Sequence, residues 1–189
     1  MGEGDANPSG TTPAQDPERQ PGSEGLSHIE TGQDGSTHAR MVDVGAKAVT
    51  QRSAVARAVV EFPEGLLGGL LAGEGPKGPI EEVARVAGVL AAKRTGDLVP
   101  MCHPLGLDVV EIAFEDLGGD VLEVRCRTAC QGRTGVEMEA MTGAAVAALT
   151  VYDMTKAASK GIRIGAEELL EKTGGTGGTW RRSEDDRSA

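Results

Sequence analysis

An uncharged stretch of 13 residues, AMTGAAVAALTVY at 140–152, limits most strongly what this chain can fold into. It lies within a predicted helix from about Thr134 to Ser159. At 100° per residue, one narrow face of that helix collects small or aliphatic residues: Ala140, Gly143, Ala144, Ala147, Val151 and Ala158. Because the opposite side is nearly uncharged as well, we expect burial all round, by the chain's own domain or by a partner subunit.

A carboxylate and an ammonium group, Asp153 and Lys156, follow this stretch directly, one helical turn apart. Their spacing alone indicates an ion pair at a solvated helix end, worth about 0.2–0.5 kcal/mol. Glu139, near the start of the same helix, precedes Asp153 by about 21 Å along the axis at about 1.5 Å per residue. A ligand that contacts both residues therefore needs them from different subunits, or has to be an extended molecule.

The other segments predict the rest of the fold. We expect these elements in order: a strand at 51–62, a short helix at 63–73, a helix at 78–97, a hairpin of strands at 108–116 and 120–129, the long helix, and a short strand at 161–166. This order predicts an α+β fold, a ferredoxin-like sandwich in which helices cover one face of an antiparallel sheet.

Composition separates one domain from two tails. Residues 1–37 are rich in Gly, Pro, Ser and acidic residues and predict a disordered N-terminal tail. The domain is expected at 38–178, and 179–189 as a flexible C-terminal tail. A net charge of −10 argues against nucleic acid or an anionic membrane as a partner. Three cysteines and the lack of a secretory signal favour a reducing, cytoplasmic location.

Four long motifs resemble the cyclic pyranopterin monophosphate synthase family, the molybdenum cofactor biosynthesis protein C. They are MVDVGAKAVTQRSAVARA (41–58), KRTGDLVPMCHPLGLDVVE (93–111), GRTGVEMEAMTGAAVAALTVYDMTKAASKGIRIG (132–165) and EKTGGTGG (171–178). The resemblance covers about residues 38–178. It implies a ferredoxin-like fold and a homohexamer, built as a trimer of dimers with active sites at the dimer interface.

The resemblance also implies a reaction. The family converts 3′,8-cyclo-7,8-dihydroguanosine 5′-triphosphate, supplied by a preceding radical enzyme, to cyclic pyranopterin monophosphate and releases pyrophosphate. Such a rearrangement needs proton transfer and cations around a triphosphate. It needs no redox cofactor and is compatible with Mg²⁺ bound to the triphosphate.

The resemblance assigns roles residue by residue. Asp153, Lys156 and Lys77 match the family's catalytic residues. The matched substrate contacts are Met101, Cys102, His103, Glu137, Met138 and Glu139, and the expected phosphate ligands are Lys93, Arg133 and Lys172. Two positions depart from the family pattern, because Arg133 and Thr176 stand where lysine is usual.

Three alternatives were weighed. Cys102, His103, Cys126 and Cys130 offer the ligand types of a zinc module, although adjacent Cys and His are poor paired ligands and buried thiols are the more common role. GGTGG lacks the P-loop pattern and is rejected as a phosphate loop. A non-catalytic ferredoxin-like domain that binds a small ligand between subunits differs from the enzyme only in turnover.

Overall fold

The computed structural model describes residues 29–31, 34–74 and 77–183, and the chain divides into two compact units at Ala39/Arg40. In the first unit, β1 (Ile29–Thr31) pairs antiparallel with β2 (Thr37–Ala39). The tail predicted at 1–37 lies largely outside the described residues. Its described part includes this short ladder, so the prediction of disorder stays a prediction for the remainder.

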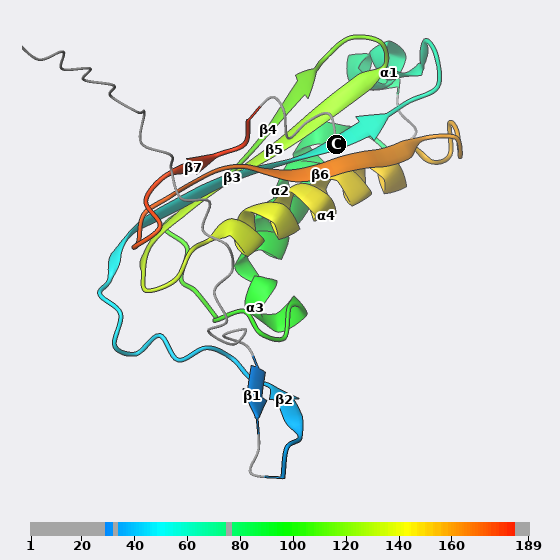
Figure 1. Cartoon of the computed structure of the whole chain (residues 1–189). Helices are drawn as coiled ribbons and strands as arrows, with labels where there is room; N and C mark the ends of the chain where they lie inside the picture. Colours follow the sequence, from blue (N-terminus) through cyan, green and yellow to red (C-terminus); the bar gives the residue numbers. More distant parts are fainter. Residues whose placement is uncertain (1–28, 32–33, 75–76, 184–189) are drawn as a thin grey trace, which may run out of the picture. The chain divides into compact units, whose positions relative to one another are not determined.

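The second unit is built on a five-stranded antiparallel sheet with the strand order β4-β5-β3-β6-β7. The strands are β3 (Thr50–Glu61), β4 (Val109–Asp116), β5 (Val121–Gly132), β6 (Arg163–Thr173) and β7 (Trp180–Arg181). The helices are α1 (Leu66–Gly69), α2 (Ile80–Lys93), α3 (Thr95–Leu98) and α4 (Glu137–Thr155), and a π-helical turn, η1 (Leu70–Glu74), follows α1. Figure 1 shows α2 and α4 on one face of the sheet. The predicted α+β ferredoxin-like sandwich is confirmed.

Buried and exposed residues alternate along the strands, and this alternation explains which face of the sheet the helices cover. Every second residue of β3 is buried in the core, from Ala54 to Val60, and β5 repeats the pattern from Leu122 to Cys130. A strand turns successive side chains to opposite faces, so these small and aliphatic residues all meet the helices. The same core holds the small-residue face of α4.

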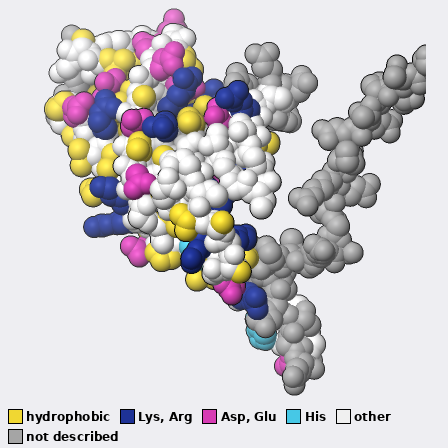
Figure 2. Space-filling model, turned by 90° about the vertical axis from the view of Figure 1, so that its left-hand side faces the viewer, with side chains coloured by type: hydrophobic (Ala, Val, Ile, Leu, Met, Phe, Trp, Pro, Cys, Tyr) yellow, Lys and Arg dark blue, Asp and Glu magenta, His cyan; other side chains and the backbone are white. Residues whose placement is uncertain are grey.

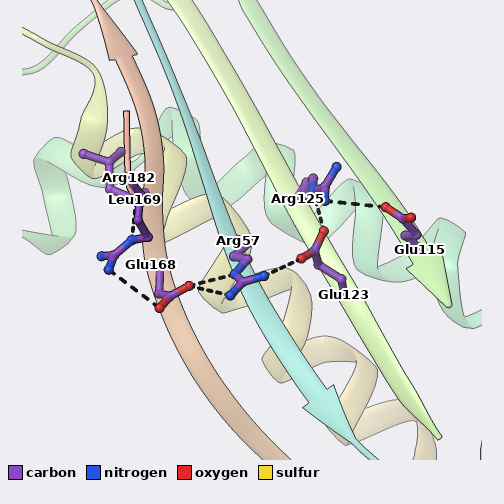
Figure 3. A network of polar contacts seen from close by, with 7 residues as sticks. All are labelled: Arg57, Glu115, Glu123, Arg125, Glu168, Leu169 and Arg182. Atoms are coloured by element: carbon purple, nitrogen blue, oxygen red, sulfur yellow. Dashed lines mark hydrogen bonds and ion pairs between the residues drawn. The ribbon is translucent and has the colours of Figure 1, made fainter. Parts of the chain in front are cut away.

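The opposite face of the sheet carries a network of charges (Figure 3). Arg57 on β3 donates to Glu168 on β6 at 2.7 Å and to Glu123 on β5 at 3.0 Å. Glu123 also pairs with Arg125, and Arg182 lies 3.8 Å from Glu168. Glu123 is almost completely buried and Glu168 is partly buried, and each of these carboxylates contacts two arginines that compensate its negative charge. The network therefore links three neighbouring strands on the side away from the helices.

The predicted small-residue face of α4 is confirmed over most of its length. Ala140, Gly143, Ala144, Ala147 and Val151 are all buried. The expectation for Ala158 is wrong, because α4 ends at Thr155 and Ala158 is exposed beyond it. The expected burial all round is not met within this chain, since Leu149 on the outer side of α4 is 57% exposed.

Two glycines allow the helices to approach the sheet and each other. A Cβ atom on Gly143 would lie 2.5 Å from Cys126 Sγ, and one on Gly88 of α2 would lie 2.9 Å from the Gly143 carbonyl oxygen. Real Cβ atoms do not come so close. Both positions therefore require glycine for packing rather than for an unusual backbone angle.

We predict that Gly143→Leu lowers the free energy of unfolding by about 1–3 kcal/mol, because the branched side chain overpacks a filled contact. Thermal unfolding followed by circular dichroism measures the change. Gly68→Leu in α1 is the matched control, since a Cβ there meets no atom within 4 Å. Equal melting temperatures for the Gly143→Leu variant and the parent would show that α4 is loosely packed at this point.

Other boundaries differ from the sequence prediction. The short helix expected at 63–73 is split into α1 and η1, with Gly73 in a left-handed conformation. The strand expected at 161–166 runs on to Thr173, because β6 stays paired with β3 as far as Ser53. Within the predicted tail at 179–189, Trp180 and Arg181 form β7 against β6, and residues 184–189 lie outside the described part.

Candidate active site

The predicted site residues gather at the two ends of α4. We call Lys77, Asp153 and Lys156 the C-terminal cluster. The other predicted residues lie nearer the helix start and are called the N-terminal group: Lys93, Met101, Cys102, His103, Arg133, Glu137, Met138, Glu139 and Lys172. The two sets differ in how their side chains contact one another and in how deeply those side chains are buried.

In the C-terminal cluster, one carboxylate binds two ammonium groups. Lys156 Nζ lies 2.7 Å from Asp153 Oδ1, and Lys77 Nζ lies 2.8 Å from Asp153 Oδ2. Lys77 Nζ also donates to the Asp153 backbone carbonyl at 3.0 Å. All three side chains are about half-exposed. The fold thus brings Lys77 into contact with Asp153 although 76 residues separate them.

The two lysines fix the charge state of this cluster. The hydrogen bond from Lys156, followed by that from Lys77, lowers the pKa of Asp153 from 3.8 to about 2. In return, Asp153 raises the pKa of Lys156. Two ammonium groups and one carboxylate leave a net positive charge at this end of α4. In the single chain the cluster therefore suits an anionic ligand, and Asp153 is ionised at neutral pH.

We predict that Asp153 titrates with a midpoint near 2 in a carboxyl ¹³C NMR titration. Because its folded pKa is depressed, its ion pairs stabilise the fold above pH 3.8 and are lost as the pH falls through about 2. Lys156→Ala should raise the midpoint towards 3.8, whereas Lys160→Ala, which removes a nearby exposed lysine, should not move it. A parent midpoint already near 3.8 would contradict the ion-paired geometry.

In the N-terminal group, Glu139 is a buried carboxylate beside more exposed charges. Glu139 is only 4% exposed. Its burial, and to a smaller extent the nearby charge of Glu137, raises the pKa of its carboxyl group. Glu137 Oε1 lies 3.6 Å from Lys172 Nζ on β6. Glu139 and Lys93 line a hollow of about 60 Å³ between the end of α2, α3 and Pro104. This end of α4 therefore combines a buried carboxyl of raised pKa with cations.

His103 and Arg133 lie beside a second hollow of about 410 Å³, which Val44 and Val49 also line. His103 Nε2 donates to the Val42 carbonyl oxygen at 2.7 Å, and this contact fixes the ring against the segment before β3. Burial, and then the charge of Glu139, raises the pKa of the Cys102 thiol. Cys102 is therefore suited to contact a ligand as a neutral thiol and not to act as a thiolate nucleophile.

Arg52 is a residue of this region that the sequence did not single out. Its guanidinium donates to the carbonyl oxygens of Gly132 and Arg133, each at 3.3 Å. A Cβ on Gly175 would lie 1.8 Å from Arg52 Nη1, so the turn after β6 closes directly on this side chain. Arg52 therefore connects the loop of Arg133 with the turn that follows Lys172. Only the β3–β5 register, in which Thr50 faces Gly132, reveals this contact.

The zinc alternative gains no support from the geometry. Across residues 29–31, 34–74 and 77–183, no group of three or more His, Cys, Asp or Glu side chains is arranged to hold a metal ion. Cys126 and Cys130 are buried thiols on the inner face of β5, and burial raises the pKa of Cys126 to about 12.

None of the helices in the described part is both long and apolar enough to cross a membrane.

One chain does not bring the two sets of residues to one small ligand. Glu139 and Asp153 both lie on α4, which is continuous from Glu137 to Thr155. Fourteen residues at about 1.5 Å each separate them by about 21 Å along the axis. Within a single chain, a ligand that contacts both Glu139 and Asp153 would therefore have to extend over that whole distance.

A family model and individual relatives both relate this chain to the same family of proteins. The MoaC family model matches residues 41–175. A cyclic pyranopterin monophosphate synthase of Novosphingobium aromaticivorans is 48% identical over 159 residues, covering 84% of this chain and 98% of the relative. One from Thermomicrobium roseum is 50% identical over 163 residues, with 85% and 95% covered. One from Listeria monocytogenes is 49% identical over 143 residues, with 76% and 89% covered.

Proposed function

Because the chain belongs to the MoaC family, we propose that it acts in molybdenum cofactor biosynthesis as a cyclic pyranopterin monophosphate synthase. The proposed reaction converts 3′,8-cyclo-7,8-dihydroguanosine 5′-triphosphate to cyclic pyranopterin monophosphate and releases pyrophosphate, which makes the protein a lyase. The observation that carries the proposal is the contact of Lys77, Asp153 and Lys156, three residues that match the family's catalytic positions.

We propose that this C-terminal cluster transfers protons and stabilises charge on the substrate. The two ammonium groups can donate to oxygens that become negative during rearrangement. Asp153 holds both lysines within hydrogen-bond distance, so it orients the donors before substrate arrives. A substrate phosphate that pairs with one lysine would weaken its bond to Asp153 and allow the carboxylate to accept a proton.

We further propose that the complete site combines half-sites from two chains. The C-terminal cluster of one chain would face the N-terminal group of its partner, where Lys93, Arg133 and Lys172 supply phosphate ligands and Glu139 supplies a buried carboxyl. The separation of about 21 Å along α4 supports this arrangement, since a small substrate cannot span it within one chain. A homohexamer formed as a trimer of dimers would provide such pairs.

The remaining features of the proposal follow from the chemistry. The rearrangement changes no oxidation state overall, so we propose no resident redox cofactor, and Mg²⁺ would enter with the triphosphate rather than through a built protein site. The preceding radical enzyme would supply the substrate, in a cytoplasmic setting. Basic side chains are interspersed with acidic ones on the face in Figure 2, which is unlike the contiguous basic surface that nucleic acid requires.

The test is turnover of the cyclic guanosine triphosphate by the purified full chain. The expected result is formation of cyclic pyranopterin monophosphate and of one pyrophosphate per substrate. Chromatography measures the first product, and a coupled assay measures the pyrophosphate. Tight binding of the substrate without any product would instead assign the chain to the non-catalytic ligand-binding class and overturn the enzymatic proposal.

A further inference from the structure

Asp120, in the turn between β4 and β5, has an unusual backbone conformation. Its φ angle is 61°, and within the described part of the chain it is the one residue other than glycine with a positive φ. Gly118 and Gly119 precede it with φ angles of 79° and 61°. A third glycine would adopt the same conformation without strain, so the turn by itself does not require a side chain at this position.

The side chain of Asp120 binds the start of α1, which lies beside this turn in Figure 1. Asp120 Oδ2 accepts from the Gly65 amide at 2.7 Å, and Oδ1 accepts from the Leu67 amide at 2.9 Å. The Asp120 carbonyl oxygen also accepts from the Phe62 amide at 2.8 Å. Gly65 is the N-cap of α1 and has no side chain, so the capping oxygens come from a residue 55 positions away in the sequence. The amide of Leu67, followed by that of Gly65, lowers the pKa of the Asp120 carboxyl, which is therefore ionised at neutral pH.

The segment that begins at this cap leads to Lys77. The chain passes through α1 and η1 and reaches Lys77 ten residues after Leu67. A hollow of about 140 Å³ separates η1 from the residues that follow Lys77, and its lining includes Leu70, Leu71, Gly73, Gly78 and Pro79. The described residues between α1 and α2 are rich in glycine, which restricts the backbone least. The position of Lys77 therefore depends on the contacts that hold the two ends of this segment.

We infer that Asp120 is a positioning residue for Lys77: it fixes the start of α1 to the β4–β5 turn and so keeps Lys77 Nζ 2.8 Å from Asp153 Oδ2. Leu67 and Leu70 are buried and hold the same segment in the core. Apolar packing has no preferred direction, whereas hydrogen bonds to two amides define the orientation of α1. Asp120 bonds to residues 62–67, so its effect on the C-terminal cluster passes through the segment that carries Lys77. The catalytic consequence of this contact rests on the proposed function of that cluster.

The test follows the Asp153 carboxyl by ¹³C NMR titration of the full chain, which detects the Lys77 contact without any turnover. Asp120→Gly removes the carboxylate and keeps a residue suited to a φ of 61°. We expect this variant to raise the Asp153 midpoint from about 2 towards 3.8, as far as Lys77→Ala raises it. Removal of a negative charge alone would lower the midpoint, so the sign of the shift distinguishes a lost contact from a change of charge. In the Lys77→Ala background, Asp120→Gly should produce no further rise.

Asp116→Ala is the matched control, because Asp116 accepts from the Gly118 amide at 2.8 Å within the same turn and carries the same charge. It should not raise the Asp153 midpoint. Asp120→Asn keeps one oxygen that accepts from an amide, so it should shift the midpoint less than Asp120→Gly does. A parental midpoint in Asp120→Gly, with only a lower melting temperature, would show that Asp120 merely caps α1 and would overturn the inference.

Turnover measured on the same variants separates this inference from the proposed function. If Lys77 is catalytic, Asp120→Gly should lower kcat by up to about 100-fold, the usual cost of a small misplacement of a reacting group. The same change should have no effect on kcat in the Lys77→Ala background. A raised Asp153 midpoint with parental turnover would support the positioning of Lys77 by Asp120 and would contradict the catalytic role proposed for Lys77.

Discussion

Alanine at Asp153 or at Lys156 should lower the rate of product formation by about 10²–10⁴-fold, the usual effect of losing a proton-transfer group. Fold and assembly should persist, because both side chains are half-exposed and make only ion pairs in the cluster. A surface ion pair of purely structural value would cost well under about 1 kcal/mol and leave the rate unchanged. The two roles for these residues therefore predict rates that differ by orders of magnitude.

The measurement is the initial rate of conversion of the cyclic guanosine triphosphate, with oligomer mass determined in parallel. Lys160→Ala serves as the control, since it removes an exposed lysine close to Lys156 in sequence. It should retain parental turnover. If the Asp153→Ala and Lys156→Ala variants also turn over at the parental rate, the cluster is structural and its proposed catalytic role is wrong.

Mixing two inactive variants should restore activity if the site combines two chains. Asp153→Ala removes the carboxylate of the C-terminal cluster, and Glu139→Ala removes the buried carboxyl of the N-terminal group. In a random one-to-one mixture half of the dimers are mixed, and each mixed dimer has one intact site, so we expect about a quarter of parental activity. Each variant alone should remain nearly inactive.

The matched control mixes Asp153→Ala with Lys156→Ala. Both changes affect the same cluster of one chain, so every site in the mixed assembly retains a defect and no activity should return. Co-expression with two affinity tags isolates the mixed species for assay. Failure of the Asp153→Ala and Glu139→Ala mixture to regain activity would mean that Glu139 and Asp153 do not act on the same substrate from different chains.

Sequence periodicity was sufficient for the architecture. The residues at 51–62 predicted a strand, which is confirmed as β3, and the small-residue face of α4 was correctly predicted to be buried over most of its length. The helix was predicted to end at Ser159, but α4 ends at Thr155. The alanines that follow Thr155 resemble those within the helix, so composition alone did not show where it ends. The length of β6 was underestimated because its pairing with β3, and not its own residues, determines where it ends.

The candidate site was only partly accessible from sequence. Motif resemblance pointed to Lys77, but its bond to Asp153 depends on how the segment after η1 returns to the end of α4. Arg52 gave no local signal, since its contacts to Gly132 and Arg133 exist only through strand register. Tertiary contacts between segments about 80 residues apart are not encoded in any short window of residues.

Because α4 is an unbroken helix between Glu139 and Asp153, it fixes both the distance between these two residues and their relative direction about the helix axis. Each residue of a helix adds about 1.5 Å of length but turns the next side chain by about 100°. One inserted residue would therefore barely change the span, yet in the proposed two-chain site it would rotate Asp153 and Lys156 away from the N-terminal group of the partner. If the site combines two chains in this way, a one-residue insertion in α4 should lower activity more than most substitutions on its exposed side.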